Sequence, residues 1–347
     1  MKTKKIIEVI LCVILCYPMM GWANGKVELT GLDNYTIPLN KKGALIGKVI
    51  PQQNGQITLL KDTAGIFRID KSGCIRLKRN VKLTSSTPAF RYGITIESEG
   101  KTTELELVKD EFIHNKVVAH RGAWKNHDAS ENSLSALKNA IEIGCEGSEF
   151  DVWLSADSAL IISHDPKIGG KQVEKTTREE LKMISLKNND YVPELKDFLL
   201  TINKQNKTRL FLEVKPSQLG KERSIALTDM VVKMVHDLKV QAWVNYISFS
   251  YPVLQRIQEL DPAAKTAFLS DSKKIEEIKA DKLWGIDYPF TAFKNDKDLI
   301  KNSHKLGLSV NIWTVNDSKD LKLYLDEGAD LITTNEPEML LQMVKKE

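Results

Sequence analysis

Apolar and polar residues follow different patterns in the first third of the chain and in the rest. Residues 24–115 contain short runs in which apolar and polar residues alternate, namely GQITLL, GIFRIDKSGCIRL, FRYGITIES and TTELELV. A period of two is typical of strands with one face in water. Turn residues separate the runs, so the pattern predicts an antiparallel, sandwich-like all-β domain over residues 24–115.

From residue 116 onward, apolar runs of strand length alternate with amphipathic segments of helical period. The apolar runs are VVAHRG, GSEFDVWL, LIISHD, RLFLEVKP, NYISFS, KTAFLS, LWGIDYP, LSVNIWTVN and ADLITTN. Gly144, Gly307 and Gly328 close three of the helical segments, as C-terminal caps do. About eight β-α units predict a TIM (β/α)8 barrel over residues 116–347. A doubly wound sheet is the alternative, but no glycine-rich GxGxxG turn follows the first run.

The first 23 residues have the layout of a secretory signal peptide. A basic segment at residues 2–5 precedes an apolar run over residues 6–20, and Gly21 and Ala23 place small residues before a cleavage point. An uncleaved membrane anchor is the alternative, but the run is shorter than the about 20 residues that a span needs. We therefore expect export across the inner membrane to a periplasmic or extracellular location.

The amino-acid composition excludes several classes of protein but does not identify the function. The 347 residues are 42% hydrophobic and 28% charged, which is typical of a globular protein and excludes a disordered or multi-span chain. A net charge of +4 is too small for a dedicated nucleic-acid binder. Only Cys74 and Cys145 follow the predicted signal peptide, so the chain is no disulfide scaffold, and we expect both thiols to be free.

Polar side chains interrupt the apolar runs close to their C-terminal ends. In a parallel barrel these ends form the face that carries the active site. The residues concerned are His120, Arg121, Glu149, Asp151, His164, Glu213, Lys215, Trp313 and Asn335. We therefore expect these side chains to meet at one mouth of the barrel.

Two of the runs carry charged residues with a spacing of two. Glu149 and Asp151 must therefore face the same side of their strand, as must Glu213 and Lys215. Carboxylates on one inward face repel each other and lose hydration unless a cation lies between them. Three carboxylates without a cysteine ligand favour Ca²⁺ or Mg²⁺. For any single pair, a surface-facing strand or an ion pair with an arginine is the alternative.

Two histidines accompany this acidic cluster. Imidazole titrates near neutral pH, so His120 and His164 at neighbouring strand ends predict an acid–base pair, whereas a lone histidine is more often structural. Arg121 and Lys215 add positive charge at the same place. A metal ion and two cationic side chains together favour an anionic ligand, of which phosphate is the simplest.

The order and spacing of these motifs resemble those of the glycerophosphodiester phosphodiesterase family. The matching segments are HRG at 120–122, ENS at 131–133, EFD at 149–151, HD at 164–165, LEVK at 212–215, WTVN at 313–316 and ITTNEP at 332–337. The resemblance implies a TIM barrel, a divalent ion, usually Ca²⁺ or Mg²⁺, and hydrolysis of glycerophosphodiesters to sn-glycerol 3-phosphate and an alcohol. In the N-terminal region, FRIDKSGCIRLKRNVKL followed by YGITIES resembles a cadherin-like repeat, without its calcium motifs.

The family resemblance also implies roles for individual residues. His120 and His164 would be the general acid and base. The metal ligands would be Glu149, Asp151 and Glu213, and the substrate-binding residues would be Arg121, Lys215, Glu131, Phe249 and Trp313. Glu131 would orient Arg121 or the metal shell, and the two aromatic residues would form an apolar wall beside the glycerol. One departure is Ser130, where the family usually has proline, which bears on substrate preference more than on chemistry.

Two other functions remain compatible with these residues. A phosphodiesterase acting on a lysophospholipid or a phosphoinositol would share the barrel, the metal and the histidines, but would release a cyclic phosphate. A secreted binding protein on an inactive barrel is less compatible, because the expected acid, base and metal ligands are all intact. The N-terminal domain is compatible with three roles, as a spacer, as a lid or in contact with the cell envelope, and its sequence does not distinguish among them.

Overall fold

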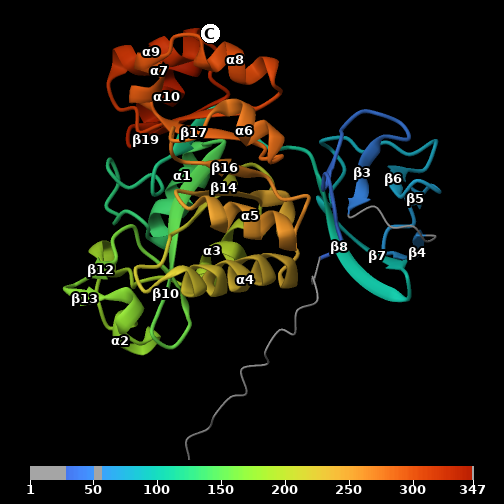
Figure 1. The fold of residues 1–347 in the computed structure, drawn as a ribbon. Coiled ribbons are helices and arrows are strands. Elements are labelled where there is room, and N and C mark those ends of the chain that lie inside the picture. Colours follow the sequence, from blue (N-terminus) through green and yellow to red (C-terminus); the bar gives the residue numbers. More distant parts are fainter. Residues whose placement is uncertain (1–28, 51–56, 346–347) are drawn as a thin grey trace, which may run out of the picture.

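The computed structural model describes residues 29–50 and 57–345. A barrel of strands surrounded by helices forms the larger part, and a smaller all-β part lies beside it (Figure 1). The predicted signal peptide lies outside the described residues. Within the described ranges, no helix combines the length and the apolar character that a membrane span requires.

Eight parallel strands close into a barrel, which confirms the predicted TIM-barrel fold. In order around the barrel they are β9 (Val117–Ala119), β10 (Gly147–Leu154), β14 (Arg209–Val214), β15 (Val244–Ser248), β16 (Thr266–Phe268), β17 (Gly285–Pro289), β18 (Ser309–Trp313) and β19 (Leu331–Thr334). Closure comes from β9, which pairs in parallel with both β10 and β19. All C-terminal strand ends therefore lie at one mouth.

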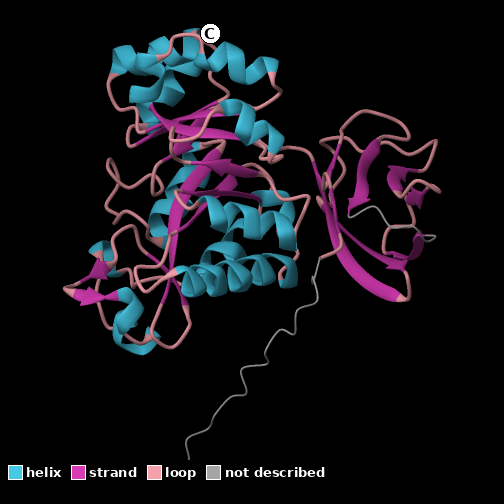
Figure 2. Cartoon of the chain, viewed as in Figure 1, coloured by secondary structure: helices cyan, strands magenta, loops and turns pink. Residues whose placement is uncertain are grey.

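Helices cover the outside of the barrel (Figure 2). They are α1 (Leu134–Ile143), α3 (Leu195–Ile202), α4 (Lys221–Asp237), α5 (Tyr251–Leu260), α6 (Ile275–Ala280), α7 (Phe290–Asn295), α8 (Leu299–Lys305), α9 (Ser318–Asp326) and α10 (Pro337–Val344). The three predicted cap glycines, Gly144, Gly307 and Gly328, all have positive φ at the ends of α1, α8 and α9. Glycine reaches this conformation without the steric cost that other residues incur.

Alternation along the strands decides which side chains enter the barrel. In β14, Leu210, Leu212 and Val214 belong to the core that also contains residues of the helices, whereas Phe211 belongs to a separate cluster inside the barrel. Since neighbouring residues of a strand point to opposite faces, Glu213 points inward with Phe211. The same rule directs Glu149 and Asp151 of β10 inward, because Phe150 and Val152 pack outward.

The third of the nine apolar runs, LIISHD, is not a barrel strand. Residues Leu160–Ile162 form β11, which pairs antiparallel with the end of β10. A small excursion follows, with β12 (Lys167–Ile168), β13 (Lys171–Gln172) and α2 (Arg178–Lys182). It has a core of its own made of Trp153, Ile161, Val173, Leu181 and Val192. The excursion therefore carries His164 at the edge of the barrel mouth.

The N-terminal part contains two four-stranded sheets. One has the order β1 (Gly31–Leu32), β3 (Leu45–Ile50), β6 (Cys74–Leu77) and β5 (Phe67–Ile69), and the other the order β2 (Thr36–Ile37), β8 (Lys101–Lys109), β7 (Arg91–Ser98) and β4 (Ile57–Asp62). Side chains from both sheets share one hydrophobic core. The pair β2–β8 is parallel, unlike the antiparallel pattern that the sequence predicts. Cys74 and Cys145 are free thiols.

These sheets contact the barrel at the end opposite to the strand C-termini. Leu29 N–H donates to the carbonyl of Leu260, at the end of α5 (2.8 Å). Arg91 Nη1 donates to the carbonyl of Asn203 before β14 (3.1 Å), and its guanidinium lies 5.8 Å from the ring centre of Trp243, which precedes β15. Leu260, Asn203 and Trp243 all precede barrel strands, so these contacts lie at the N-terminal end of the barrel. The N-terminal domain is therefore no lid over the mouth where the catalytic side chains are expected.

Candidate active site

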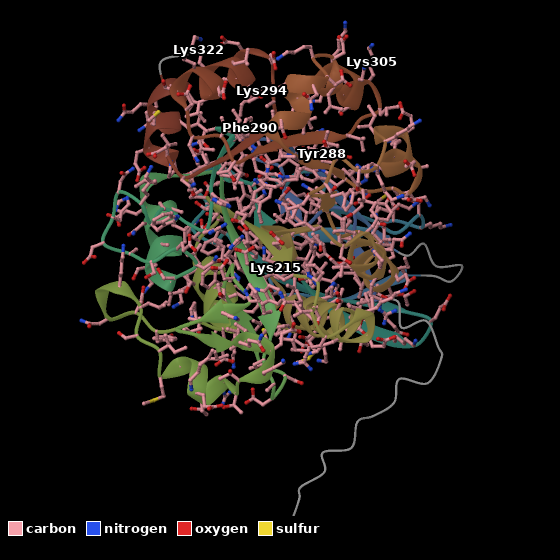
Figure 3. All side chains as sticks on the ribbon, turned by 60° about the vertical axis from the view of Figure 1, so that its left-hand side comes forward. Lys215, Tyr288, Phe290, Lys294, Lys305 and Lys322 are labelled. Atoms are coloured by element: carbon pink, nitrogen blue, oxygen red, sulfur yellow. The ribbon has the colours of Figure 1, made fainter. Side chains whose placement is uncertain are left out.

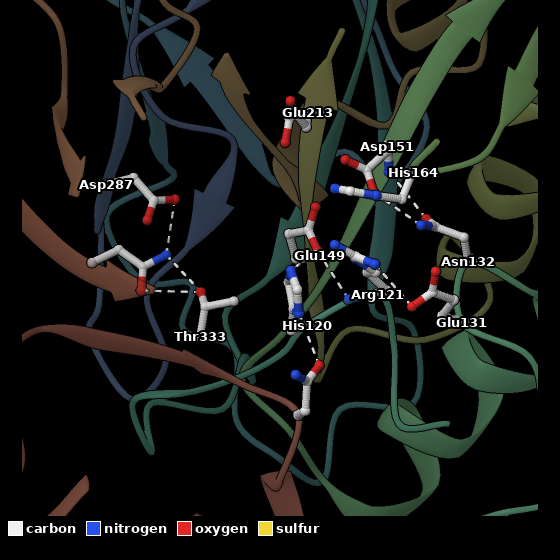
Figure 4. A network of polar contacts seen from close by, with 12 residues as sticks. His120, Arg121, Glu131, Asn132, Glu149, Asp151, His164, Glu213, Asp287 and Thr333 are labelled. Carbon is white, nitrogen blue, oxygen red and sulfur yellow. Dashed lines mark hydrogen bonds and ion pairs between the residues drawn. The ribbon is translucent and has the colours of Figure 1, made fainter. Parts of the chain in front are cut away.

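The side chains predicted at the strand ends meet around one cavity at the C-terminal mouth of the barrel (Figure 4). The cavity has a volume of about 130 Å³. Its lining consists of His120, Arg121, Glu149, His164, Glu213, Ile247, Phe249, Leu269, Asp287, Trp313, Thr314 and Thr333. Seven of the ten predicted site residues line it directly, and Asp151, Lys215 and Glu131 contact those seven or one another.

Three buried carboxylates form the centre of the site. Glu149, Asp151 and Glu213 each offer an oxygen, and these oxygens lie within 4.8 Å of one another. The buried Lys215, labelled in Figure 3, places Nζ 2.8 Å from Asp151 Oδ1 and 2.9 Å from Glu213 Oε1. One ammonium against three carboxylates leaves the cluster short of positive charge.

Burial and mutual repulsion perturb these carboxyl groups. Burial, followed by the charges of Asp151 and Glu213, raises the pKa of Glu149 well above its ordinary value. Burial and Asp151 likewise raise the pKa of Glu213 to about 8, against the opposing effect of Lys215. At Asp151 burial alone would raise the pKa, but Lys215 holds it below its ordinary value. Without a further cation, the cluster therefore retains protons near neutral pH.

The donor set fits a hard divalent cation. All three groups are oxygen donors, which Ca²⁺ and Mg²⁺ prefer. Oxygens bound to one Ca²⁺ at about 2.3–2.6 Å can lie up to about 5 Å apart, and the three oxygens here satisfy that limit. The buried, under-neutralised carboxylates of Glu149, Asp151 and Glu213 could therefore hold such an ion.

His120 is held in one orientation by the end of the last barrel strand. Its Nδ1 lies 2.8 Å from Asn335 Oδ1, and its Nε2 lies 3.9 Å from Glu149 Oε2. Because the amide oxygen accepts, the proton belongs on Nδ1, and Nε2 keeps its lone pair. Burial, followed by the charge of Arg121, lowers the pKa of His120 to about 4. His120 is therefore neutral at physiological pH and can take up a proton at Nε2.

His164 lies at the more open side of the same cavity. It follows β11, its side chain is about one-third exposed, and its Nδ1 lies 2.7 Å from Asp165 Oδ1. Because the side chain is partly exposed and also lines the cavity, the His164 imidazole can contact both solvent and a ligand bound there. The structure thus brings the two predicted histidines to one cavity from different elements.

Arg121 follows His120 in a left-handed conformation, with φ of 57°. Its backbone N–H donates to Glu149 Oε2, and its Nη1 donates to Glu131 Oε2, both at 2.9 Å. Gly122 comes next with φ of 82°, and a Cβ there would lie 2.6 Å from Ala136 Cβ at the start of α1. This tight turn explains the glycine in the HRG segment, since a side chain would collide with the helix.

Phe249 and Trp313 form the apolar wall that the family resemblance implies. Their ring centres lie 5.5 Å apart at an interplanar angle of 87°. Trp313 Nε1–H donates to the backbone carbonyl of Asp287 at 2.7 Å, which fixes the indole across β17 and β18. Ile247 and Leu269 continue the apolar lining. One side of the cavity is therefore charged and the other mainly apolar.

Sequence reasoning missed two polar residues of the site, Asn132 and Asp287, and it placed a third, Asn335, at the barrel mouth without giving it a role. Asn132 donates to Asp151 Oδ2 (2.8 Å) and accepts from Asp151 N–H (3.1 Å), so it orients that carboxylate. Asn335 fixes His120, and Asp287 lies in the cavity wall. Both asparagines stand inside the segments ENS and ITTNEP, which was a usable signal. Asp287 stands in an apolar run, where only the alternation of LWGIDYP could have shown that it faces inward.

Fold and cavity together define a TIM barrel with an acidic cluster and two histidines at its C-terminal mouth. The model of the Glycerophosphoryl diester phosphodiesterase family matches residues 120–339, which is more than half of the chain. The chain therefore belongs to this family and is a glycerophosphodiester phosphodiesterase. The matched residues lie within the barrel, and the N-terminal sheets lie outside the match.

Individual relatives agree with this assignment. A glycerophosphodiester phosphodiesterase of Caldanaerobacter subterraneus is 26% identical over 257 residues, which cover 66% of this chain and 98% of the relative. The crystal structure of a glycerophosphodiester phosphodiesterase from Parabacteroides distasonis is 35% identical, with a TM-score of 0.64 over 67% of this chain and 97% of that one. An Oleispira antarctica phosphodiesterase, solved with the product sn-glycerol-3-phosphate, is 26% identical, with a TM-score of 0.58 and coverage of 67% and 97%.

Proposed function

We propose that this protein hydrolyses glycerophosphodiesters to sn-glycerol 3-phosphate and an alcohol, using a divalent ion and the His120–His164 pair. The observation that carries the proposal is the meeting of both histidines and three under-neutralised carboxylates around one cavity. The product bound to the Oleispira relative supports the choice of substrate class. Glu149, Asp151 and Glu213 would hold the ion, either Ca²⁺ or Mg²⁺.

The geometry supports a role for each side chain that would lie near the phosphate. The ion, when bound, would neutralise negative charge on the non-bridging phosphate oxygens. Arg121 is held by Glu131 through Nη1, while its buried Nε–H has no partner among the described residues and can bind a phosphate oxygen. Lys215 differs from the role implied by the resemblance, because its Nζ contacts two carboxylates and the residue does not line the cavity. We therefore assign Lys215 to holding the metal ligands in place.

We assign the two proton transfers from the positions of the two histidines on the cavity lining. His120 Nε2 takes the proton of the attacking hydroxyl as its oxygen bonds to phosphorus. The bond from phosphorus to the leaving alcohol breaks, and His164 gives its proton to that oxygen. The attacker is either water or the glycerol hydroxyl of the substrate itself, which would form a cyclic phosphate before hydrolysis. An ¹⁸O-water experiment combined with trapping of a cyclic phosphate separates these two routes.

The test of the proposed function is release of glycerol 3-phosphate from a panel of glycerophosphodiesters by the purified protein. We expect no release in EDTA and recovery with Ca²⁺ or Mg²⁺, because the carboxylate cluster lacks positive charge without an ion. The ion that restores the higher rate is the preferred cofactor. Release that persists after complete metal removal would contradict the metal assignment, and no release with either ion would contradict the activity.

Asn335 should influence the protonation of His120. We expect Asn335→Ala to lower kcat by about tenfold, because His120 loses the acceptor that fixes its tautomer. Asn335→Asp should move the acid limb of the pH–rate profile to higher pH, because a carboxylate raises the pKa of the adjacent imidazole. Asn302→Ala, on the surface of α8, is the matched control and should behave as wild type. An unmoved acid limb in Asn335→Asp would contradict this role.

We also propose that the protein is exported with cleavage after Ala23. The basic segment, the apolar run and the small residues of the N-terminus support this proposal. N-terminal sequencing of the protein recovered from the periplasm or the medium tests it, and an intact Met1 on cytoplasmic protein would contradict it. After export, the N-terminal domain would be free to contact the cell envelope without covering the cavity.

A further inference from the structure

One buried carboxyl group of the cavity has no part in the mechanism described above. Asp287 lies in the sixth barrel strand, β17, and is only 1% exposed. It points inward, because its neighbours Ile286 and Tyr288 pack in the outer core. It lines the same cavity as His120 and Trp313. A buried carboxyl group among apolar side chains is costly, so its partners decide its role.

A hydrogen-bond network across three strands fixes one of its two oxygens. Asp287 Oδ2 accepts from Asn311 Nδ2 at 3.0 Å, and the same amide donates to Thr333 Oγ1 at 2.9 Å. Thr333 Oγ1 also lies 3.2 Å from Asn311 Oδ1, which completes the network drawn in Figure 4. In contrast, the buried Asp287 Oδ1 has no hydrogen-bond partner among the residues that the structure describes.

Among the described residues, none donates a hydrogen bond to that oxygen. Ile247 and Leu269, on the same cavity wall, are apolar, and the Trp313 N–H already donates to the Asp287 backbone carbonyl. The raised pKa of Asp287, about 7, comes from burial and is opposed only by the Asn311 hydrogen bond. No charged side chain therefore acts on it strongly. In Figure 4 Asp287 lies on the far side of His120 from Arg121.

A ligand whose phosphate lies at Arg121 and the carboxylate cluster would thus present its uncharged part to Asp287. The cavity volume of about 130 Å³ is roughly ten times the space that one water needs, so a small organic group fits. An unpaired carboxyl oxygen needs a hydrogen-bond donor, and the donor of an uncharged, polyol-like group is its hydroxyl. An alkyl group at the same place would leave Oδ1 unpaired, which disfavours its binding.

We propose that Asp287 is a specificity-determining residue, whose Oδ1 accepts a hydrogen bond from a hydroxyl of the glycerol moiety. The inference rests on the proposed function and deepens it, because it explains how the site selects glycerol phosphates over plain alkyl phosphates. The Asp287–Asn311–Thr333 network would hold the carboxyl group in its accepting orientation before the ligand arrives.

The test compares the binding of sn-glycerol 3-phosphate and n-propyl phosphate by calorimetry in the metal-loaded protein. The two ligands share the phosphate and a three-carbon chain and differ in two hydroxyls. We expect the wild type to prefer sn-glycerol 3-phosphate by about tenfold, because n-propyl phosphate would leave the buried acceptor Asp287 Oδ1 unpaired. Asp287→Ala should reduce this preference to within about threefold, by weakening sn-glycerol 3-phosphate alone. Asp287→Asn, which retains hydrogen-bonding capacity, should keep part of the preference.

Other results would overturn the inference. Equal weakening of both ligands in Asp287→Ala would show a structural role, and an equal affinity of the wild type for both would show that no hydroxyl is read. If Asp287→Ala does not fold, Asp287→Leu, which has a similar size and also lacks an acceptor, decides, and an unchanged preference there overturns the proposal. Turnover of the glycerophosphodiester panel by the same wild-type preparation distinguishes failure of this inference from failure of the proposed function, because absent turnover of every member rejects the proposed function itself.

Discussion

Turnover of glycerophosphocholine should fall by about 10²–10⁴-fold in a His120→Ala variant, the usual contribution of a positioned acid–base group. His120 is the better placed of the two histidines for the base role. Burial and Arg121 lower its pKa to about 4, and Asn335 accepts from Nδ1. The imidazole is therefore already neutral near pH 7, and Nε2 can accept a proton. Alanine leaves the attacking hydroxyl without a proton acceptor.

Steady-state kinetics together with circular dichroism of the variant measure this effect apart from folding. His304→Ala is the matched control, because His304 lies on the exterior, with Nε2 2.9 Å from Asp330 Oδ2 and outside the candidate site. We expect the control to keep wild-type turnover. A His120→Ala variant that turns over within a few fold of wild type would refute the base assignment, whatever His164 does.

Divalent ions should raise the unfolding temperature, and the rise should be larger at pH 8 than at pH 5. The pKa of Glu213 is raised to about 8 in the folded protein and that of Glu149 is raised well above its ordinary value. An unfolded glutamate titrates near 4.3. Between these values the metal-free folded state holds more protons than the unfolded state, so its stability falls as pH rises. A bound ion replaces these protons, so its stabilising effect grows through the same window.

Thermal unfolding in EDTA, Ca²⁺ and Mg²⁺ at several pH values measures this linkage. At an ion concentration of about one hundred times Kd, the gain is about 2.7 kcal/mol. A Glu149→Gln, Glu213→Gln double variant supplies the control, because it lacks the charges that attract the ion. It should show no metal effect and should lose less stability between pH 5 and pH 8 in EDTA. A metal-induced shift of equal size at both pH values would contradict the cluster as the binding site.

The barrel could be predicted from the sequence because its strands are buried on both faces. Such strands read as continuous apolar runs, and the charged exceptions, such as Glu213, mark inward positions near the catalytic mouth. The run at 160–165 was ambiguous for the same reason. A short apolar run has no feature that separates a barrel strand from the antiparallel β11. This run pairs with β10 because the short loop between the two strands turns the chain back, and the periodicity of the sequence does not predict that turn.

The polar network of the site was less visible than its charges. Asn132 and Asn335 act by orienting Asp151 and His120, and a neutral amide does not stand out in a motif as a carboxylate pair does. The role of Asp287 could not be predicted, because a single acidic residue in an apolar run points inward or outward according to the strand register, which the sequence does not give. The docking of the N-terminal sheets depends on single contacts such as Arg91 with Asn203, which no local pattern encodes.

The contact between the N-terminal sheets and the barrel has a consequence for how this enzyme can change over generations. The contacted residues stand in segments that lead into strands, whereas the residues around the cavity stand at strand C-termini and in the segments that lead away from them. Insertions or substitutions in the second set can reshape substrate choice without disturbing the seam between the two domains. The segments that follow the strands can therefore change under selection for substrate, while the segments that precede them change under selection for the contact between the two domains.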